Sequence, residues 1–268
     1  GITIGWADGD NWYSGTPPSA ENGSDLLIPA TEKGIYPVLS AATVVGGTLT
    51  IARDGQLSLN GHNLETGRVA TDGQSPCLTI ERGAKLFAGP GAPTITIHAG
   101  IVNNGSVRGK PKLKIAGRTS TVLLDGTQAL ELAELSTSAS FFPYQILAKG
   151  SIAVEGNLIL GGGRLVVQSE NFVVREDLFF RGMKSNVILV PENDLILHGT
   201  IRSEGSAYCV EVPGSIPKWS QAEERAFCQL SPKAGWVRMV GKGDQTISPG
   251  GILPPIALDK PSGKVRLS

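Results

Sequence analysis

A short hydrophobic pattern recurs along the chain from about residue 46 to residue 205. In each copy two apolar residues flank a central residue, and a turn rich in glycine follows. The copies lie at residues 49–51, 78–80, 95–97, 113–115, 158–160, 172–174, 187–189 and 195–197. Alternation with a period of two is typical of a β-strand that buries one face. We therefore predict a series of very short strands, each ending at a turn.

These strands are too short to bury an apolar face individually. Repeats of this kind become stable when successive copies stack around a shared core, which is the architecture of a β-solenoid. Asx-Gly and related pairs separate the strands, and glycine there permits the positive φ that a tight corner requires. Such pairs occur at residues 54–55, 60–61, 72–73, 82–83, 104–105 and 125–126. The predicted fold class is all-β, with a parallel β-helix.

The composition supports this prediction. The 268 residues include 35 Gly and 17 Pro, and only 18% are charged, so the chain is rich in turns and poor in the residues that long helices need. This length would suit two average domains, but all-β folds of this size often form one unit. We predict one solenoid with additions at its ends.

The chain divides into four segments. Residues 1–45 are rich in loop-forming residues and are predicted to cap the first rung, because an open end exposes strand edges and core side chains. Residues 46–205 are the predicted rungs, with an insertion near 127–145 whose leucines suit either a short helix or a strand. Residues 206–235 form an excursion, and residues 236–268 return to strands. The uneven spacing of the rungs excludes the fixed nonapeptide of calcium-binding β-rolls.

The hydrophobic copies lie closer together after residue 146, about 12 to 15 residues apart. This spacing leaves room only for very short strands and turns. Two arrangements satisfy this spacing. The chain there forms either coils made of very short strands and turns, or a β-meander.

The excursion contains a helix signal between two cysteines. Ser220 and Glu223 have the Ser-x-x-Glu spacing of a capping box, which predicts a short helix. Cys209 and Cys228 flank this helix, and we predict that they form a disulfide. Closing a loop of this length would stabilise the chain by about 3 kcal/mol in the chain-entropy model. A disulfide also belongs in an oxidising compartment.

Three further residues relate to this excursion and to the remaining cysteine. Trp219 and Trp236 flank the predicted helix and are expected to pack it against the solenoid. Cys77 has no partner in this scheme and is either a small core residue or a reactive thiol. The chain has no Cys-x-x-Cys motif and no Cys/His spacing suited to zinc, so we predict neither a metal nor another cofactor.

The charge balance gives little indication of a charged partner. The chain has 24 Lys and Arg against 24 Asp and Glu. Lys110, Lys112 and Lys114 alternate along one predicted strand, which is typical of a solvated face and does not indicate nucleic-acid binding. No run of about 18 apolar residues occurs, so no membrane span is predicted. A chain that begins with Gly1 is consistent with a processed secreted protein or a trimmed one, and we expect a secreted or cell-surface location.

The two ends of the chain carry a resemblance to a known class of protein. Residues 10–18, 27–29, 36–38, 47–51, 55–61, 243–247 and 258–265 resemble the β-solenoid repeat regions of large secreted bacterial surface proteins and adhesins. The middle of the chain resembles them only in its pattern, and the cysteine-flanked excursion differs from them. The resemblance implies a stalk, an adhesive surface or a module beside a separate catalytic domain. The last strand has no polar cap after it, from which we expect a longer polypeptide or a docked partner.

A weaker resemblance links the pattern to right-handed β-helical polysaccharide lyases and hydrolases. Hydrolysis requires two carboxylates about 5 to 10 Å apart, and a lyase requires a base with a neighbouring charge neutraliser. No paired motif identifies such residues, so no catalytic residue is assigned, and the histidines are interpreted as structural. The candidates are the acids Glu81, Asp125, Glu155, Glu176 and Asp177, the arginines Arg164, Arg175 and Arg181, and the histidines His62, His98 and His198.

The aromatic residues indicate a binding site more directly. Trp6, Trp12, Tyr13 and Tyr36 lie within the first 36 residues, and exposed aromatic rings are good platforms for the apolar faces of sugars. The alternative is that these rings plug the first rung. We predict a non-catalytic, adhesin-like binding or structural module whose partner is a polysaccharide or a cell-surface protein. The other two hypotheses are a carbohydrate-active enzyme and an inert spacer.

Overall fold

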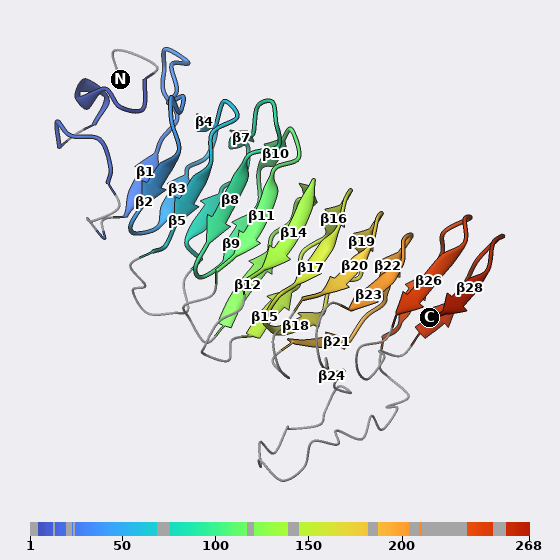
Figure 1. Ribbon diagram of the computed structural model, residues 1–268. Helices are drawn as coiled ribbons and strands as arrows, with labels where there is room; N and C mark the ends of the chain where they lie inside the picture. The colour runs from blue at the N-terminus through green and yellow to red at the C-terminus, as the bar shows by residue number, and fades with distance from the viewer. Residues whose placement is uncertain are drawn as a thin grey trace, which may run out of the picture.

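The chain forms a parallel β-solenoid (Figure 1). The only helical element among the described residues is the 3-10 turn η1 (Gly9–Asn11), and the strands pair in parallel from one coil to the next. The predicted all-β parallel β-helix is therefore confirmed. The structure, a computed structural model, describes residues 5–12, 14–19, 23, 25–68, 76–116, 121–138, 145–181, 187–203, 209–210, 235–248 and 256–268.

Two long sheets and a divided third face enclose the core. The first sheet consists of β1 (Leu26–Ile28), β3 (Leu49–Ile51), β6 (Leu78–Ile80), β9 (Ile101–Asn103), β12 (Thr121–Asp125), β15 (Gln145–Ala148), β18 (Gly163–Val167), β21 (Val187–Pro191) and β24 (Cys209–Val210). The second sheet consists of β2 (Thr43–Val45), β5 (Leu64–Thr66), β8 (Thr94–Ile97), β11 (Lys112–Ile115), β14 (Glu134–Thr137), β17 (Leu158–Leu160), β20 (Leu178–Phe180), β23 (Ile201–Ser203), β26 (Gln245–Ser248) and β28 (Val265–Leu267).

The third face changes from one sheet to another along the solenoid. Its first part is a three-stranded sheet, and its second part is a six-stranded sheet. The first part contains β4 (Gln56–Ser58), β7 (Lys85–Phe87) and β10 (Ser106–Arg108), and the second contains β13 (Leu130–Leu132), β16 (Ile152–Val154), β19 (Phe172–Val174), β22 (Leu195–Leu197), β25 (Val237–Met239) and β27 (Ile256–Leu258).

Inward-facing residues stack in register from coil to coil. In the first sheet the stack runs through Leu78, Ile101, Leu124, Ala148 and Val167, all of which are buried. Each apolar residue thus packs on the equivalent residue of the next coil. An isolated strand of three residues would have no such neighbour and could not bury its apolar face. This stack is the shared core that the sequence pattern predicts.

The hydrophobic pattern recurs on all three faces, so its spacing is not the length of a coil. Residues 49–51 lie in the first sheet, 95–97 in the second and 172–174 in the third face. Register gives the true coil length, because Leu49 pairs with Leu78, 29 positions later, and Ile146 pairs with Leu165, 19 positions later. The close spacing after residue 146 therefore reflects successive strands of one coil and not a β-meander.

The insertion near residues 127–145 contains strands, whereas the sequence pattern was compatible with either a short helix or a strand. Leu130 and Leu132 in β13 are buried, whereas Glu131 between them is exposed. β13 pairs with β16, which continues the third face. The alternation of apolar and charged residues decides the structure here, because it matches a period of two and not of 3.6.

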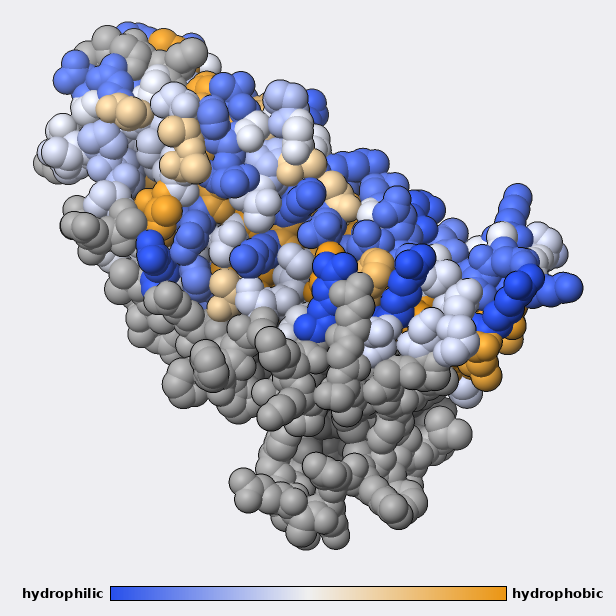
Figure 2. Space-filling model, viewed as in Figure 1, coloured by the Kyte–Doolittle hydropathy of each residue, from blue (hydrophilic) through white to orange (hydrophobic). Residues whose placement is uncertain are grey.

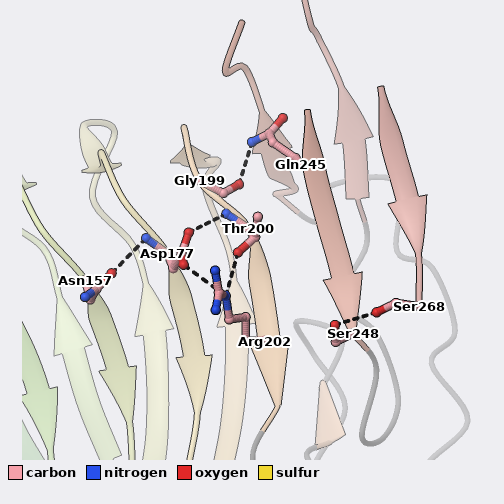
Figure 3. A network of polar contacts seen from close by, with 8 residues as sticks. All are labelled: Asn157, Asp177, Gly199, Thr200, Arg202, Gln245, Ser248 and Ser268. Carbon is pink, nitrogen blue, oxygen red and sulfur yellow. Dashed lines mark hydrogen bonds and ion pairs between the residues drawn. The ribbon is translucent and has the colours of Figure 1, made fainter. Parts of the chain in front are cut away.

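Polar side chains just before the strands join successive coils. The Asn157 side-chain oxygen accepts a hydrogen bond from the Asp177 N–H at 3.0 Å, and an Asp177 carboxylate oxygen accepts one from the Thr200 N–H at 2.8 Å (Figure 3). These contacts satisfy backbone donors at the turns, where no strand partner is available. We call them Asx clamps. The other Asx clamps join Asp25 to Thr48, Asn63 to Thr94, Asn104 to Thr127, Asp194 to Trp236, and Asp244 to Lys264.

Removal of one Asx clamp is expected to destabilise the fold measurably. Asp177→Ala leaves the Thr200 N–H without this acceptor and also removes the ion pair with Arg202, whose Nε lies 3.1 Å from an Asp177 oxygen. We expect a loss of about 1–2 kcal/mol in the free energy of unfolding. Asp177→Asn is the matched control, because it retains an acceptor oxygen and loses mainly the exposed ion pair, at a cost below about 1 kcal/mol. Urea unfolding measures both, and equal losses would contradict the role of the clamp.

The predicted helix and disulfide lie outside the described residues. β24 places the backbone of Cys209 in the first sheet, but Cys228, Trp219 and the capping-box residues belong to 211–234, which the structure does not describe. Both therefore stay predictions. Trp236 lies at the end of this stretch and is 39% exposed.

Cys77 is a core residue. It is a free cysteine, and it belongs to the main hydrophobic cluster. Burial raises the pKa of the Cys77 thiol above its usual value, and a protonated thiol is a poor nucleophile. The interpretation of Cys77 as a small core residue is confirmed over that of a reactive thiol.

The visible outer surface of the solenoid is mainly polar (Figure 2). Among the described residues the exposed large apolar side chains are Leu27, Trp236, Leu258 and Leu267. Leu258 and Leu267 occupy inward-facing positions of the last rung, since they pair with the buried residues Met239 and Ile247. No helix in the described part of the chain is both long and apolar enough to cross a membrane.

Candidate functional site

A hollow of about 540 Å³ lies at the N-terminal end of the solenoid. Its walls come from the cap, from β1, from the loop that follows β1 and from the end of β2. This volume is typical of a site for a small molecule or a segment of a polymer. The described lining residues are Asn11, Trp12, Ser14, Thr16, Pro17, Pro18, Ser19, Asp25, Leu26, Leu27, Ile28, Pro29, Thr31, Ile35, Tyr36, Pro37 and Val45.

Trp6 plugs the first rung and does not line this hollow. Its side chain is 4% exposed and belongs to the core cluster. Its backbone N–H donates to the Val38 carbonyl at 3.0 Å, beside a parallel bridge between Gly5 and Val38. Trp6 was a predicted ligand-binding residue. The structure assigns it the alternative role, because a ring in the core has no face left for a ligand.

Trp12 packs on Trp6 and also lines the hollow. The two ring centroids are 4.9 Å apart with the planes at 67°, which is an edge-to-face contact. The Trp12 indole Nε1 donates to the Trp6 carbonyl at 2.8 Å. These two contacts fix the orientation of the Trp12 ring.

Tyr36 contributes a second aromatic ring to the same hollow. Its hydroxyl donates to the Asp54 carbonyl at 3.1 Å, so its polar end is also held by the backbone. Of the four predicted ligand-binding residues, the structure thus brings Trp12 and Tyr36 together. Tyr13 lies outside the described residues.

The edge of the first sheet forms one wall. Among the described strands β1 pairs with β3 alone, and the bonds run from the Leu26 N–H to the Thr48 carbonyl and from the Ala52 N–H to the Ile28 carbonyl. Because the peptide groups of a strand alternate in direction, those of Leu27 point away from β3. The Leu27 side chain is 59% exposed. The wall therefore offers one backbone donor, one backbone acceptor and an apolar side chain.

Asp25 is the only carboxylate among the described lining residues, and it is already engaged. One carboxylate oxygen accepts hydrogen bonds from the Thr48 hydroxyl at 2.7 Å and from the Thr48 N–H at 3.0 Å. These bonds hold the pKa of Asp25 below its usual value. The carboxylate stays ionised at neutral pH and serves to join β1 to β3.

Four of the five candidate catalytic acids, all but Glu176, have structural partners among the described residues. Glu81 accepts a hydrogen bond from the Arg53 N–H at 2.8 Å, and Asp125 accepts one from the Gly126 N–H at 2.7 Å. Glu155 lies 3.3 Å from Lys110. Asp177 forms the Asx clamp described above. A carboxylate engaged in this way stabilises the contact between its turn and the neighbouring group.

The candidate arginines lie on one coil but on its different faces, in β18 and just after β19 and β20. Arg175 lies 3.5 Å from Glu155, Arg164 donates to Gln145 at 2.6 Å, and the Arg181 guanidinium lies over the ring of Phe179. The described residues contain no group of three or more His, Cys, Asp or Glu arranged to bind a metal.

Two of the histidines interact with charged residues of the preceding coil. His98 is buried, and its Nε2 lies 2.8 Å from a carboxylate oxygen of Glu65 on the preceding coil. Burial lowers the pKa of His198, and the positive charge of Arg175 lowers it further. Neither histidine lies near the hollow, since neither is among its lining residues.

No family model, no curated protein and no solved structure matches this chain. Its function is therefore inferred from its geometry.

Proposed function

We propose that this chain is a non-catalytic, adhesin-like binding module of a secreted or cell-surface protein, and that its N-terminal hollow binds a glycan. The observation that carries the proposal is the placement of Trp12 and Tyr36 in one hollow. The polar end of each ring is fixed by a backbone carbonyl. A ligand that stacks on them meets rings that are already ordered, which reduces the entropy lost on binding.

The solenoid gives this hollow a rigid support. β1 forms one wall and is joined to β3 by the strand ladder and by the clamp from Asp25 to Thr48. Trp6 fills the core directly behind Trp12. A site built on packed strands holds its shape better than a site built on loops alone.

The enzyme hypothesis has less support. A glycosidase requires one carboxylate with a raised pKa and a second one facing it. Within the described residues, four of the five candidate acids, all but Glu176, bond to backbone N–H groups or to cations of other coils. An inert spacer would not need an aromatic hollow, so the spacer hypothesis leaves that feature without a purpose.

Trp12→Ala tests the proposal. We expect at least about a tenfold loss of affinity for whichever polysaccharide retains the unmodified protein, because stacking on a preordered ring contributes on the order of 1.4 kcal/mol. Affinity electrophoresis in gels containing single polysaccharides measures the change. Trp12→Phe keeps an aromatic ring against Trp6. Comparison of this variant with Trp12→Ala distinguishes a loss of ligand stacking from a disturbance of the cap.

Phe179→Ala is the matched control, since Phe179 is a partly exposed aromatic residue of β20 outside the hollow. Its affinity should equal that of the unmodified protein. An equal loss for Trp12→Ala and Phe179→Ala would contradict the assignment of the site.

A further inference from the structure

We infer that the hollow selects an uncharged glycan over one carrying carboxylate or sulfate groups. This inference rests on the proposed function and names the class of its ligand. It follows from three features of the hollow: the charge of its lining, the charge of the surrounding cap, and the hydrogen-bonding groups of its walls.

The described lining residues offer no cationic partner for an anion. None of these described residues is a lysine, an arginine or a histidine. Recognition of carboxylate or sulfate in proteins relies on such cations, above all on arginine. The charged side chain that is present, Asp25, is negative and is committed to Thr48.

The cap around the hollow is itself negative. Residues 1–45 contain one basic residue, Lys33, against five acidic ones, which are Asp8, Asp10, Glu21, Asp25 and Glu32. An anionic polymer approaching the hollow therefore meets like charge, which disfavours its association. The rest of the chain compensates for this excess, because the whole chain is neutral.

The polar groups of the walls match hydroxyl groups, which both donate and accept hydrogen bonds. Leu27 presents a peptide N–H and a peptide C=O away from β3. Ser14 and Thr31 donate their hydroxyl hydrogens to the Thr16 and Ile35 carbonyls. The Ser14 oxygen also accepts from the Thr16 hydroxyl at 3.4 Å, and both oxygens keep a lone pair able to accept. A neutral sugar can satisfy both kinds of group, whereas a carboxylate or sulfate can only accept.

The test compares neutral polysaccharides with charged derivatives of the same backbone. Hydroxyethyl cellulose, galactomannan and xylan are each paired with their carboxymethylated forms in affinity electrophoresis at low salt. We expect Trp12-dependent binding to at least one neutral polymer and at least about tenfold weaker binding to its carboxymethylated form, with the difference shrinking as salt screens the charges.

A pair of variants at Leu27 tests the wall. Leu27→Pro and Leu27→Ala both replace the leucine side chain with a smaller apolar one, but only proline removes the N–H. That N–H takes no part in the pairing with β3, and proline is tolerated on an edge strand in this orientation. We expect Leu27→Pro to bind the neutral polymer more weakly than Leu27→Ala by up to about tenfold. Equal binding would overturn the role of this donor.

The outcomes separate the two proposals. Trp12-dependent binding that is equal or stronger for the carboxymethylated polymers would overturn the selectivity and leave the hollow as a glycan site. Absence of Trp12-dependent binding to every polymer would overturn both. Trp12-dependent binding only to an extended peptide, for which the peptide Gly-Thr-Leu-Thr-Ile-Ala of residues 47–52 is the probe, would replace the glycan with a strand added to β1.

Discussion

Phe172→Ala is expected to lower the free energy of unfolding by about 3–5 kcal/mol. Phe172 is one of the largest side chains that are fully buried. It lies in β19, where it pairs with Ile152 of the preceding coil and Leu195 of the following one. Truncation leaves a cavity that both neighbours border, and the stacked strands on either side limit how far the core can collapse into it.

Val173→Ala is the control for this substitution. Val173 is the next residue of the same strand and points outward, because neighbouring residues face opposite sides. We expect it to cost about 1 kcal/mol or less. Urea unfolding followed by circular dichroism measures both variants. Similar losses of stability for the two variants would contradict the inward-facing core position that the register gives to Phe172.

Gly126→Ala is expected to destabilise the protein by about 3 kcal/mol or more. Gly126 has φ +135°, a conformation that side chains rarely adopt. A Cβ atom built there would lie 2.0 Å from the Asn103 carbonyl oxygen, which belongs to the backbone of the preceding coil. A backbone oxygen cannot rotate away as a side chain can, so the two coils would have to separate locally.

Gly91→Ala is the matched control for this position. Gly91 also has a positive φ, +81°, but a Cβ atom there would have no neighbour within 4 Å. Only the backbone strain remains, at about 1–2 kcal/mol. Thermal and urea unfolding of the two variants separate strain from the clash between coils. An equal loss at both positions would contradict the close approach at Gly126.

The strand pattern was predictable because it depends on local alternation. A period of two and a glycine at each corner identify short stacked strands without any knowledge of their partners. Register was not predictable, since the same apolar phrase occurs on all three faces and any copy matches any other. The Asx clamps were missed for the same reason. Asn157, Asp177 and Thr200 are separated by about one coil each, and only the coil length shows that they are neighbours.

The binding site was predictable in part. Clustering of aromatic residues in the cap indicated Trp12 and Tyr36, which line one hollow. Composition does not tell a plugging ring from an exposed one, so both roles stayed open for Trp6 until the structure placed its ring in the core. Leu27 and the prolines of the wall line the hollow because the fold brings together segments that are distant in sequence, and no local pattern reveals this.

The ion pair of Lys110 with Glu155 was not predictable for the same reason, because it joins residues 45 positions apart.

Incubation of the pure protein with neutral polysaccharides, reading both retention of the protein and release of shorter or unsaturated products, tests the central claim most directly. We predict retention that depends on Trp12, with the polysaccharide left intact. Release of products would contradict a non-catalytic module and would direct attention to Glu155 and Arg175 on their neighbouring coils.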